Sequence, residues 1–191
     1  MAKNLYIIGG CNGAGKTTAS YTVLPEILDC REFVNADEIA RGLSPFNPES
    51  VAIEAGRLML SRIEELLGRN ESFSIETTLA TKSYINLVRR AQAQDYTVRI
   101  LFFWLNSPEL ALQRIAERVA KGGHNIPEPI ARRRYVAGIN NLFKLFMGEV
   151  DSWEIYDNST FPSVQIATGG KDDETSIYVK TTYNTIANYV K

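Results

Sequence analysis

The chain has 191 residues, of which 45% are hydrophobic, and its 21 basic and 22 acidic residues give a net charge of -1. This balance provides no overall attraction to nucleic acid or to an anionic membrane, so we expect neither as a partner. The longest uninterrupted apolar run, 100–105, is too short to span a bilayer, and the N-terminus lacks the apolar region of a signal peptide. We therefore expect a cytoplasmic protein built as one domain over residues 1–191.

The first element is the segment Gly10–Thr17, here called the glycine loop, which follows the apolar run 5–8. It fits the phosphate-binding pattern G-x-x-x-x-G-K-[ST], in which glycines let backbone N–H groups surround an anion at a helix N-terminus. Lys16 can then reach the β- and γ-phosphates of a nucleotide, and the Thr17 hydroxyl can bind Mg²⁺. The alternative is a glycine-rich turn without a ligand. The predicted nucleotide-binding residues are Gly10, Asn12, Gly13, Ala14, Gly15, Lys16, Thr17 and Thr18.

A helix over about 15–24, ending near Pro25, should follow the loop, and the segment 32–37 reads as the second strand. Asp37 then lies at the carboxyl end of that strand, the edge of an open α/β sheet where ligands bind. Two interpretations remain open on spacing alone. Asp37 is either a catalytic acid facing the glycine loop or the N-cap of the next helix.

The pair Asn47-Pro48 predicts the start of a helix whose apolar residues recur at helical spacing as far as Gly68. The third predicted strand, 72–75, is followed by Glu76, Thr77 and Thr78. A carboxylate and two hydroxyls at a strand end are suited to binding a small polar substrate. Capping of the next helix, near 83–94, is the alternative.

The run 98–105 is nearly all apolar, as is typical of a strand covered on both faces. It ends in Asn106, where phosphate-loop ATPases often carry a metal-binding Asp. We therefore expect Mg²⁺ to be held by Thr17, the nucleotide and water, with help from Asp37. A helix should begin at Ser107 and Pro108.

Arginines concentrate in the next two predicted helices, with Arg114 and Arg118 in the first and 132–134 in the second. The segment between them contains Gly122, Gly123 and His124, and we expect a hinge there. This pattern predicts a lid, roughly 114–140, whose guanidinium groups stabilise charge on a transferring phosphoryl group. A solvated basic face is the alternative. His124 is expected to be a hinge or surface residue and not a general base.

The remaining chain predicts a strand over 153–159, then a loop with short strands or irregular segments at 164–168 and 177–180, and a closing helix over 182–190. The turn 157–159 is expected either to approach the adenine or only to end its strand. Strands that alternate with helices predict an α/β fold, a parallel sheet with helices on both faces.

Several segments together resemble the zeta toxin-like family of P-loop kinases. They are the glycine loop with Thr18, then 34–40, 76–79, 118–119, 122–124, 126–127, 133–135 and 156–159. The resemblance extends from the first strand to about residue 167 and implies a three-layer P-loop NTPase fold with a helical lid. The combination in this order is far more specific than the loop alone.

The resemblance also implies the roles of individual residues and the ligands ATP and Mg²⁺. Lys16 and Thr17 would bind the phosphates and the metal, and Asp37 would take a proton from the substrate hydroxyl. Glu76, Thr77 and Thr78 would orient the substrate. Arg118 and one residue of 132–134, with Arg134 the best choice, would clamp the phosphates. The family's characterised members imply UDP-N-acetylglucosamine as substrate and an antitoxin protein as partner.

We therefore predict an ATP-dependent kinase that phosphorylates a hydroxyl of a small molecule, with Asp37 as the general base. A kinase of another small hydroxyl compound or of nucleic-acid ends is an alternative within the same class, and the composition disfavours the latter. An ATP-binding switch or toxin–antitoxin component that acts through a protein partner is an alternative from a different class. We expect no large C-terminal extension and no antitoxin helix within the chain.

Overall fold

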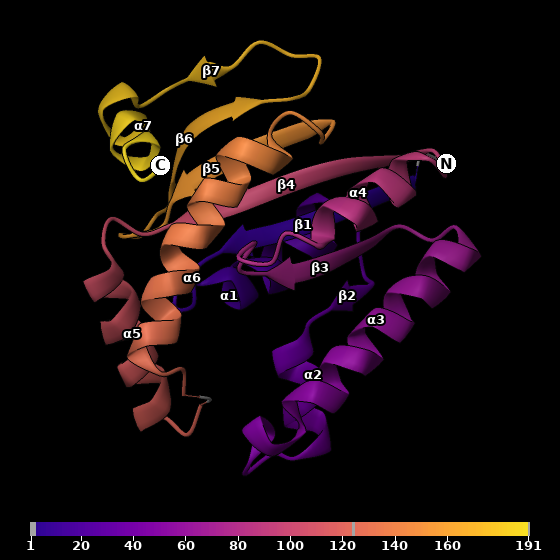
Figure 1. The fold of residues 1–191 in the computed structure, drawn as a ribbon, viewed down its shortest axis with the longest axis vertical. Coiled ribbons are helices and arrows are strands. Elements are labelled where there is room, and N and C mark those ends of the chain that lie inside the picture. Colours follow the sequence, from indigo (N-terminus) through magenta and orange to yellow (C-terminus); the bar gives the residue numbers. More distant parts are fainter. Residues whose placement is uncertain (1–2, 124, 191) are drawn as a thin grey trace.

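The computed structural model describes residues 3–123 and 125–190, and these residues form one seven-stranded sheet with strand order β2-β3-β1-β4-β5-β6-β7 (Figure 1). His124, which was expected in a hinge, lies outside the described residues. The strands are β1 (Lys3–Gly10), β2 (Phe33–Val34), β3 (Phe73–Thr77), β4 (Tyr96–Trp104), β5 (Ser152–Asp157), β6 (Val164–Gly169) and β7 (Ser176–Ile177).

The five strands β1 to β5 are parallel, whereas β6 and β7 each pair antiparallel with the preceding strand. The predicted parallel sheet is confirmed for these five strands, and the two C-terminal strands add an antiparallel part to it. The reason is the length of the connections, because the segments 158–163 and 170–175 are too short for a parallel crossover. These two strands extend the sheet as hairpins.

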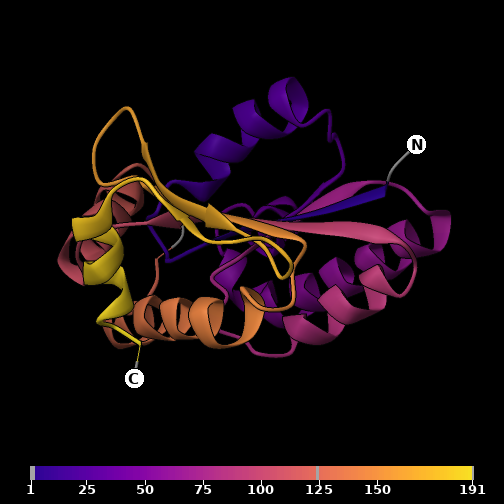
Figure 2. The ribbon, with the colours of Figure 1, turned by 90° about the horizontal axis from the view of Figure 1, so that it is seen from above.

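Helices cover both faces of the sheet. Figure 2 shows α1 on one face and α3, α4 and α6 on the other, so the predicted three-layer α/β fold is confirmed. The helices are α1 (Lys16–Thr22), α2 (Ala36–Leu43), α3 (Ala52–Arg69), α4 (Tyr84–Gln92), α5 (Pro108–Ala120), α6 (Glu128–Asn141) and α7 (Lys180–Ala187). Short helical segments lie at η1 (Val23–Ile27), η2 (Pro48–Val51) and η3 (Leu142–Phe146).

Two helix ends differ from the sequence prediction. The first helix does not stop near Pro25 but continues as the π-helical segment η1 to Ile27. The helix α3 ends one residue beyond Gly68, and Asn70 takes the left-handed conformation that closes it, with φ 55°. Asn is among the few residues other than glycine that adopt this conformation readily.

The core lies between the sheet and its helices. In the centre of the sheet, Leu5 and Ile7 of β1, Phe73 of β3 and Val98 of β4 are fully buried, and Phe102 of β4 is nearly so. Both cysteines, Cys11 and Cys30, are buried free thiols. Among the described residues, the helices lack the combination of length and apolar character that crossing a bilayer requires.

Candidate active site

The parallel register brings the polar strand ends together at one edge of the sheet. Ile8 of β1 is level with Glu76 of β3, and Val34 of β2 is level with Ile75. The glycine loop, Glu76 and the start of α2 therefore leave the sheet side by side. In an open α/β sheet this carboxyl edge is the usual ligand-binding edge.

The glycine loop has the curved backbone that its sequence predicts. Gly13 and Gly15 have φ values of 81° and 79°, a region that favours glycine. A Cβ atom at Gly13 would lie 2.7 Å from the carbonyl oxygen of Ala111, so the loop also packs closely against α5. Gly15 is the N-cap of α1, and the loop therefore leads directly into a helix N-terminus, where anions are stabilised.

Lys16 and Thr17 both contact Glu76. The Lys16 Nζ atom donates to the carbonyl oxygen of Cys11 at 3.0 Å and lies 3.6 Å from Glu76 Oε1. The Thr17 hydroxyl donates to Glu76 Oε2 at 2.8 Å. The Lys16 and Glu76 side chains are only 6% and 10% exposed, so each charge compensates the other in a region of low solvent access.

Asn35, and not Asp37, caps α2. The Asn35 Oδ1 atom accepts hydrogen bonds from the backbone N–H groups of Asp37 at 2.8 Å and Glu38 at 3.4 Å. The interpretation of Asp37 as an N-cap is therefore wrong. Its exposed carboxylate lies in the first turn of α2 and lines a cleft over the glycine loop.

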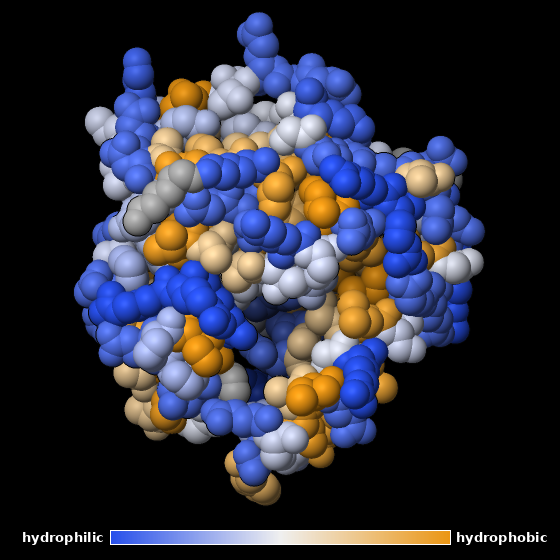
Figure 3. Space-filling model, in the orientation of Figure 1, coloured by the Kyte–Doolittle hydropathy of each residue, from blue (hydrophilic) through white to orange (hydrophobic). Residues whose placement is uncertain are grey.

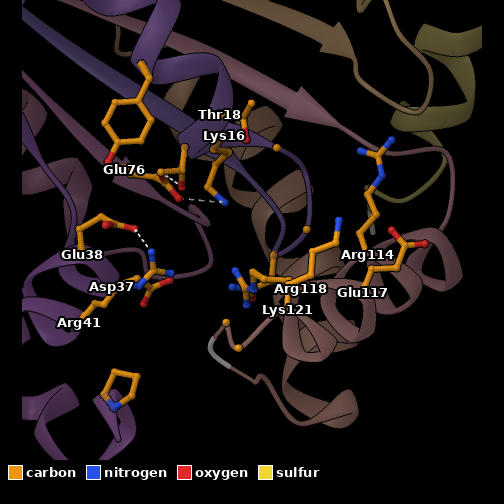
Figure 4. A pocket seen from close by; sticks show the side chains of 18 of the residues that line it. Lys16, Thr18, Asp37, Glu38, Arg41, Glu76, Arg114, Glu117, Arg118 and Lys121 are labelled. Carbon is orange, nitrogen blue, oxygen red and sulfur yellow. Dashed lines mark hydrogen bonds and ion pairs between the residues drawn. The ribbon is translucent and has the colours of Figure 1, made fainter. Parts of the chain in front are cut away.

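This cleft has a volume of about 680 Å³ and is visible as a hydrophilic hollow in Figure 3. In Figure 4, Asp37, Glu38 and Arg41 lie on one side of it and the side chains of α5 on the other, with Lys16 and Glu76 between them. The lining residues come from the glycine loop and α1 (Asn12, Gly13, Gly15, Lys16, Thr17, Thr18, Tyr21), the α2 region (Asp37, Glu38, Arg41, Pro45, Pro48), β3 (Glu76) and α5 with the following turn (Arg114, Glu117, Arg118, Lys121, Gly122, Gly123).

The predicted arginines fall in different environments. Arg114 and Arg118 line the cleft, whereas Arg134 Nη1 donates to Asn12 Oδ1 at 3.4 Å and so contacts the glycine loop from α6. Arg132 forms ion pairs with the exposed Glu109 and Glu128, both at 2.7 Å. Arg133 lines a separate pocket beside Lys82. Of the three consecutive arginines, Arg134 is therefore the one directed toward the glycine loop.

Only part of the predicted lid is separate from the core. Ile115, Ile126 and Ala131 form a small apolar cluster of their own between α5 and α6. By contrast, Tyr135 is buried and its hydroxyl donates to the carbonyl oxygen of Leu105 at 2.6 Å. A Cβ atom at Gly138 would lie 2.4 Å from the Thr78 carbonyl oxygen. The second half of α6 is thus built into the core, and any closing motion is restricted to the segment before Tyr135.

Several predicted residues do not line the cleft. The Thr77 and Thr78 hydroxyls accept hydrogen bonds from the backbone N–H groups of Leu79 at 3.1 Å and Ala80 at 3.5 Å, so they stabilise the turn after β3. Gly10 and Ala14 belong to the glycine loop but are buried. A substrate-binding role for the two threonines stays a prediction.

Asn158 does not line the cleft but contacts the backbone of the glycine loop, a role that the sequence analysis did not predict. Its Nδ2 atom donates to the carbonyl oxygen of Ala14 at 2.7 Å. The next residue, Ser159, accepts a hydrogen bond on its carbonyl oxygen from Arg114 at 3.0 Å. The turn 157–159 therefore holds both the loop and an α5 arginine. The polar turn 157–159 at the end of β5 was the sequence signal that could have indicated this role.

Cys11 lies inside the glycine loop but does not offer a reactive thiolate. Its side chain is buried, and this burial raises the pKa of the thiol to about 11 although Lys16 is close. The thiol is therefore protonated at neutral pH. The charged side chains that line the cleft are carboxylates and cations.

The family model described as zeta toxin matches residues 1–182. The chain belongs to the zeta toxin family. The membership predicted from the sequence is thereby confirmed. An uncharacterized protein of Haemophilus influenzae is 31% identical to this zeta toxin family member over 126 residues, which cover 66% of this chain and 88% of that protein.

Two solved structures show the same fold. The AvrRxo1-ORF1:-ORF2 structure with ATP has a TM-score of 0.74 and 17% identity, and the match covers 97% of this chain and 63% of that chain. This protein thus spans less than two thirds of the AvrRxo1 chain. A structure from the PezAT chromosomal toxin–antitoxin system of Streptococcus pneumoniae has a TM-score of 0.68 and 15% identity, with 99% and 78% of the two chains covered. At these identities the likeness establishes the fold alone.

Proposed function

We propose that this zeta toxin family member is an ATP-dependent kinase that transfers the γ-phosphate to a hydroxyl of a small molecule. The observation that carries the proposal is a single cleft in which the glycine loop, Asp37 and the cations of α5 face one another. Family membership and the fold shared with an ATP-containing structure support it. The triphosphate would lie along the glycine loop, with its γ-phosphate near Lys16.

In the proposed reaction, the Asp37 carboxylate takes the proton of the acceptor hydroxyl as its oxygen attacks the γ-phosphorus. A new O–P bond forms, the bond between the γ-phosphorus and the β,γ-bridging oxygen breaks, and ADP leaves. Lys16 and Arg118 would neutralise charge on the transferred group, and Arg134, which contacts the glycine loop through Asn12, would help to clamp the phosphates. Catalysis of this kind depends mainly on positioning and electrostatic stabilisation.

The residues around Thr17 fit a magnesium ion that is bound together with a nucleotide. The Thr17 hydroxyl donates its hydrogen to Glu76, so the lone pairs of its oxygen could coordinate the metal, and oxygen is the ligand type that Mg²⁺ prefers. The described residues contain no group of three or more His, Cys, Asp or Glu that could hold a metal by themselves. Phosphate oxygens and water would therefore complete the coordination, and the ion would supply charge neutralisation at the phosphates.

A nucleotide sugar such as UDP-N-acetylglucosamine is the first acceptor to test. The free end of the cleft beyond Asp37 is lined by Glu38, Arg41 and the prolines of the η2 region, a mixture of charged and apolar groups that suits a polar, partly anionic molecule. We propose that Glu76 influences the acceptor indirectly, because its oxygens are already engaged by Lys16, Thr17 and Asn35.

The test is incubation of the purified protein with ATP and Mg²⁺, alone and with a panel of nucleotide sugars, free sugars and nucleosides. We expect an acceptor whose mass increases by one phosphate, together with stoichiometric ADP. Slow ATP hydrolysis that no acceptor changes would instead favour a nucleotide-dependent switch acting through a protein partner. Absence of ATP binding would refute both interpretations.

We also propose an antitoxin protein as a partner. The PezAT relative belongs to a toxin–antitoxin system, and the AvrRxo1 structure is a complex of two proteins. If such a partner covers the cleft of this protein, it must compete with ATP. The checking measurement is ATP affinity with and without the purified partner, and an unchanged affinity would contradict this mode of inhibition.

A further inference from the structure

Asn35 lies directly between β2 and α2 and is only 6% exposed. Its side-chain carbonyl accepts hydrogen bonds from the N–H groups of Asp37 and Glu38, at 2.8 and 3.4 Å. These are first-turn amides, which have no acceptor within their own helix. The cap therefore determines how the first turn of α2, and with it Asp37, is placed at the cleft.

The amide nitrogen of the Asn35 side chain bonds to Glu76, which contacts Lys16 and Thr17. Asn35 Nδ2 donates to Glu76 Oε2 at 3.0 Å, and that oxygen also accepts the Thr17 hydroxyl at 2.8 Å. The second oxygen of Glu76 lies 3.6 Å from Lys16 Nζ. One buried amide thus connects the start of α2, through the end of β3, to the start of α1. An ionised Asp would cap the helix equally well but has no hydrogen to donate.

We propose that Asn35 is a positioning residue that sets the separation between Asp37 and the Lys16–Thr17 pair. This inference rests on the proposed function, because in-line transfer requires the base and the phosphate-binding groups to be correctly placed at the same moment. Asp37 is itself exposed, so its placement depends on the backbone of the α2 first turn. Asn35 couples that turn to the phosphate side of the site.

The first test is the variant Asn35→Asp, which keeps the cap acceptor, removes the donor and places a negative oxygen beside Glu76. We expect kcat for ATP turnover to fall about 10- to 100-fold while ATP affinity changes less than about 3-fold, since misplacement of a base affects the transition state more than ground-state binding. A wild-type kcat would show that Asn35 only caps the helix. Equal losses in kcat and ATP affinity would also overturn the positioning role. The matched control is Asn86→Asp, which adds the same charge at an exposed position of α4 and should leave turnover unchanged.

The second test needs no turnover. Melting temperatures of the ligand-free protein are compared for Asn35→Asp, Glu76→Gln and the double variant. The glutamine amide introduced at position 76 can donate to the carboxylate introduced at position 35, so the bond is re-formed with donor and acceptor exchanged. We expect the double variant to melt at a higher temperature than the sum of the single effects predicts.

Additive melting shifts would overturn the coupling between Asn35 and Glu76. This outcome is distinct from a failure of the proposed function. A wild-type protein that binds ATP but transfers no phosphate would refute the kinase proposal, and the melting cycle would still decide whether the two side chains are coupled.

Discussion

Two walls of the cleft are held by different kinds of contact. The first wall is the glycine loop with Asn35 and Glu76, and the second is α5 with the part of α6 that packs against it. On the first wall, the side chains of Lys16, Asn35 and Glu76 are at most 10% exposed and are connected through Glu76, by an ion pair to Lys16 and a hydrogen bond from Asn35. On the second, the link between α5 and α6 includes the ion pair of Arg132 with Glu109, whose side chains are 41% and 66% exposed. Buried polar networks are rigid, whereas exposed ion pairs contribute little. We therefore expect the first wall to be preformed and the second to adjust around a ligand.

The largest effect is expected from Lys16→Ala on the preformed wall. The variant removes the cation that faces both Glu76 and the proposed γ-phosphate position. We expect phosphoryl transfer to fall at least about 10³-fold, because a preorganised positive group is lost from the site of developing charge. Product mass spectrometry measures the activity and circular dichroism checks the fold. A folded variant with substantial turnover would refute the role assigned to the glycine loop.

Asp37→Asn should be the next most severe change. Turnover is expected to fall by roughly 10² to 10⁴, the usual effect of losing a positioned general base, while ATP binding is retained. The matched control is Glu38→Gln, since Glu38 lines the same cleft but pairs with Arg41 at 3.5 Å, and it should lose less than about 5-fold. Lost ATP affinity in the Asp37 variant would instead indicate a role in metal binding.

Substitutions of the arginines of α5 and α6 test the second wall, which we expect to adjust around a ligand. Arg118→Ala and Arg134→Ala should each lower kcat by about 10- to 100-fold with a smaller change in ATP affinity, as expected for groups that act mainly in the transition state. Arg132→Ala is the control on the same helix as Arg134. Its exposed ion pairs should contribute at most about 1 kcal/mol to stability and leave turnover within about 2-fold of wild type. If Arg132→Ala lowers kcat as much as the other two variants do, the contact of Arg134 with the glycine loop does not explain its effect on turnover.

The smallest effect is expected from Asn158→Ala. The substitution removes the hydrogen bond to the Ala14 carbonyl oxygen, worth about 0.5–1.5 kcal/mol, without touching the cleft. ATP affinity measured by calorimetry should weaken by only a few-fold, and kcat with saturating ATP should change little. A loss as large as that of Lys16→Ala would mean that the loop is not preformed without this support.

Much of the fold was predictable because its signals are local. The glycine loop, the apolar strand β4 and the apolar periodicity of α3 each appear within one short stretch of sequence. Asp37 and Glu76 were predicted at the sheet edge in the same way, since both follow predicted strands, and both line the cleft. The antiparallel end of the sheet was missed because pairing direction depends on the length of the connections between β5, β6 and β7.

The sequence by itself determined the P-loop fold, the glycine loop and the strand ends that surround it, because local pattern and residue chemistry specify them. Only the tertiary structure decided which side chains meet across long separations. Asn35 and Glu76 are 41 positions apart, Arg134 and Asn12 are 122 apart, and Asn158 and Ala14 are 144 apart. No local pattern records such contacts, because they depend on the order of the strands in the sheet and on the packing of α6 against it.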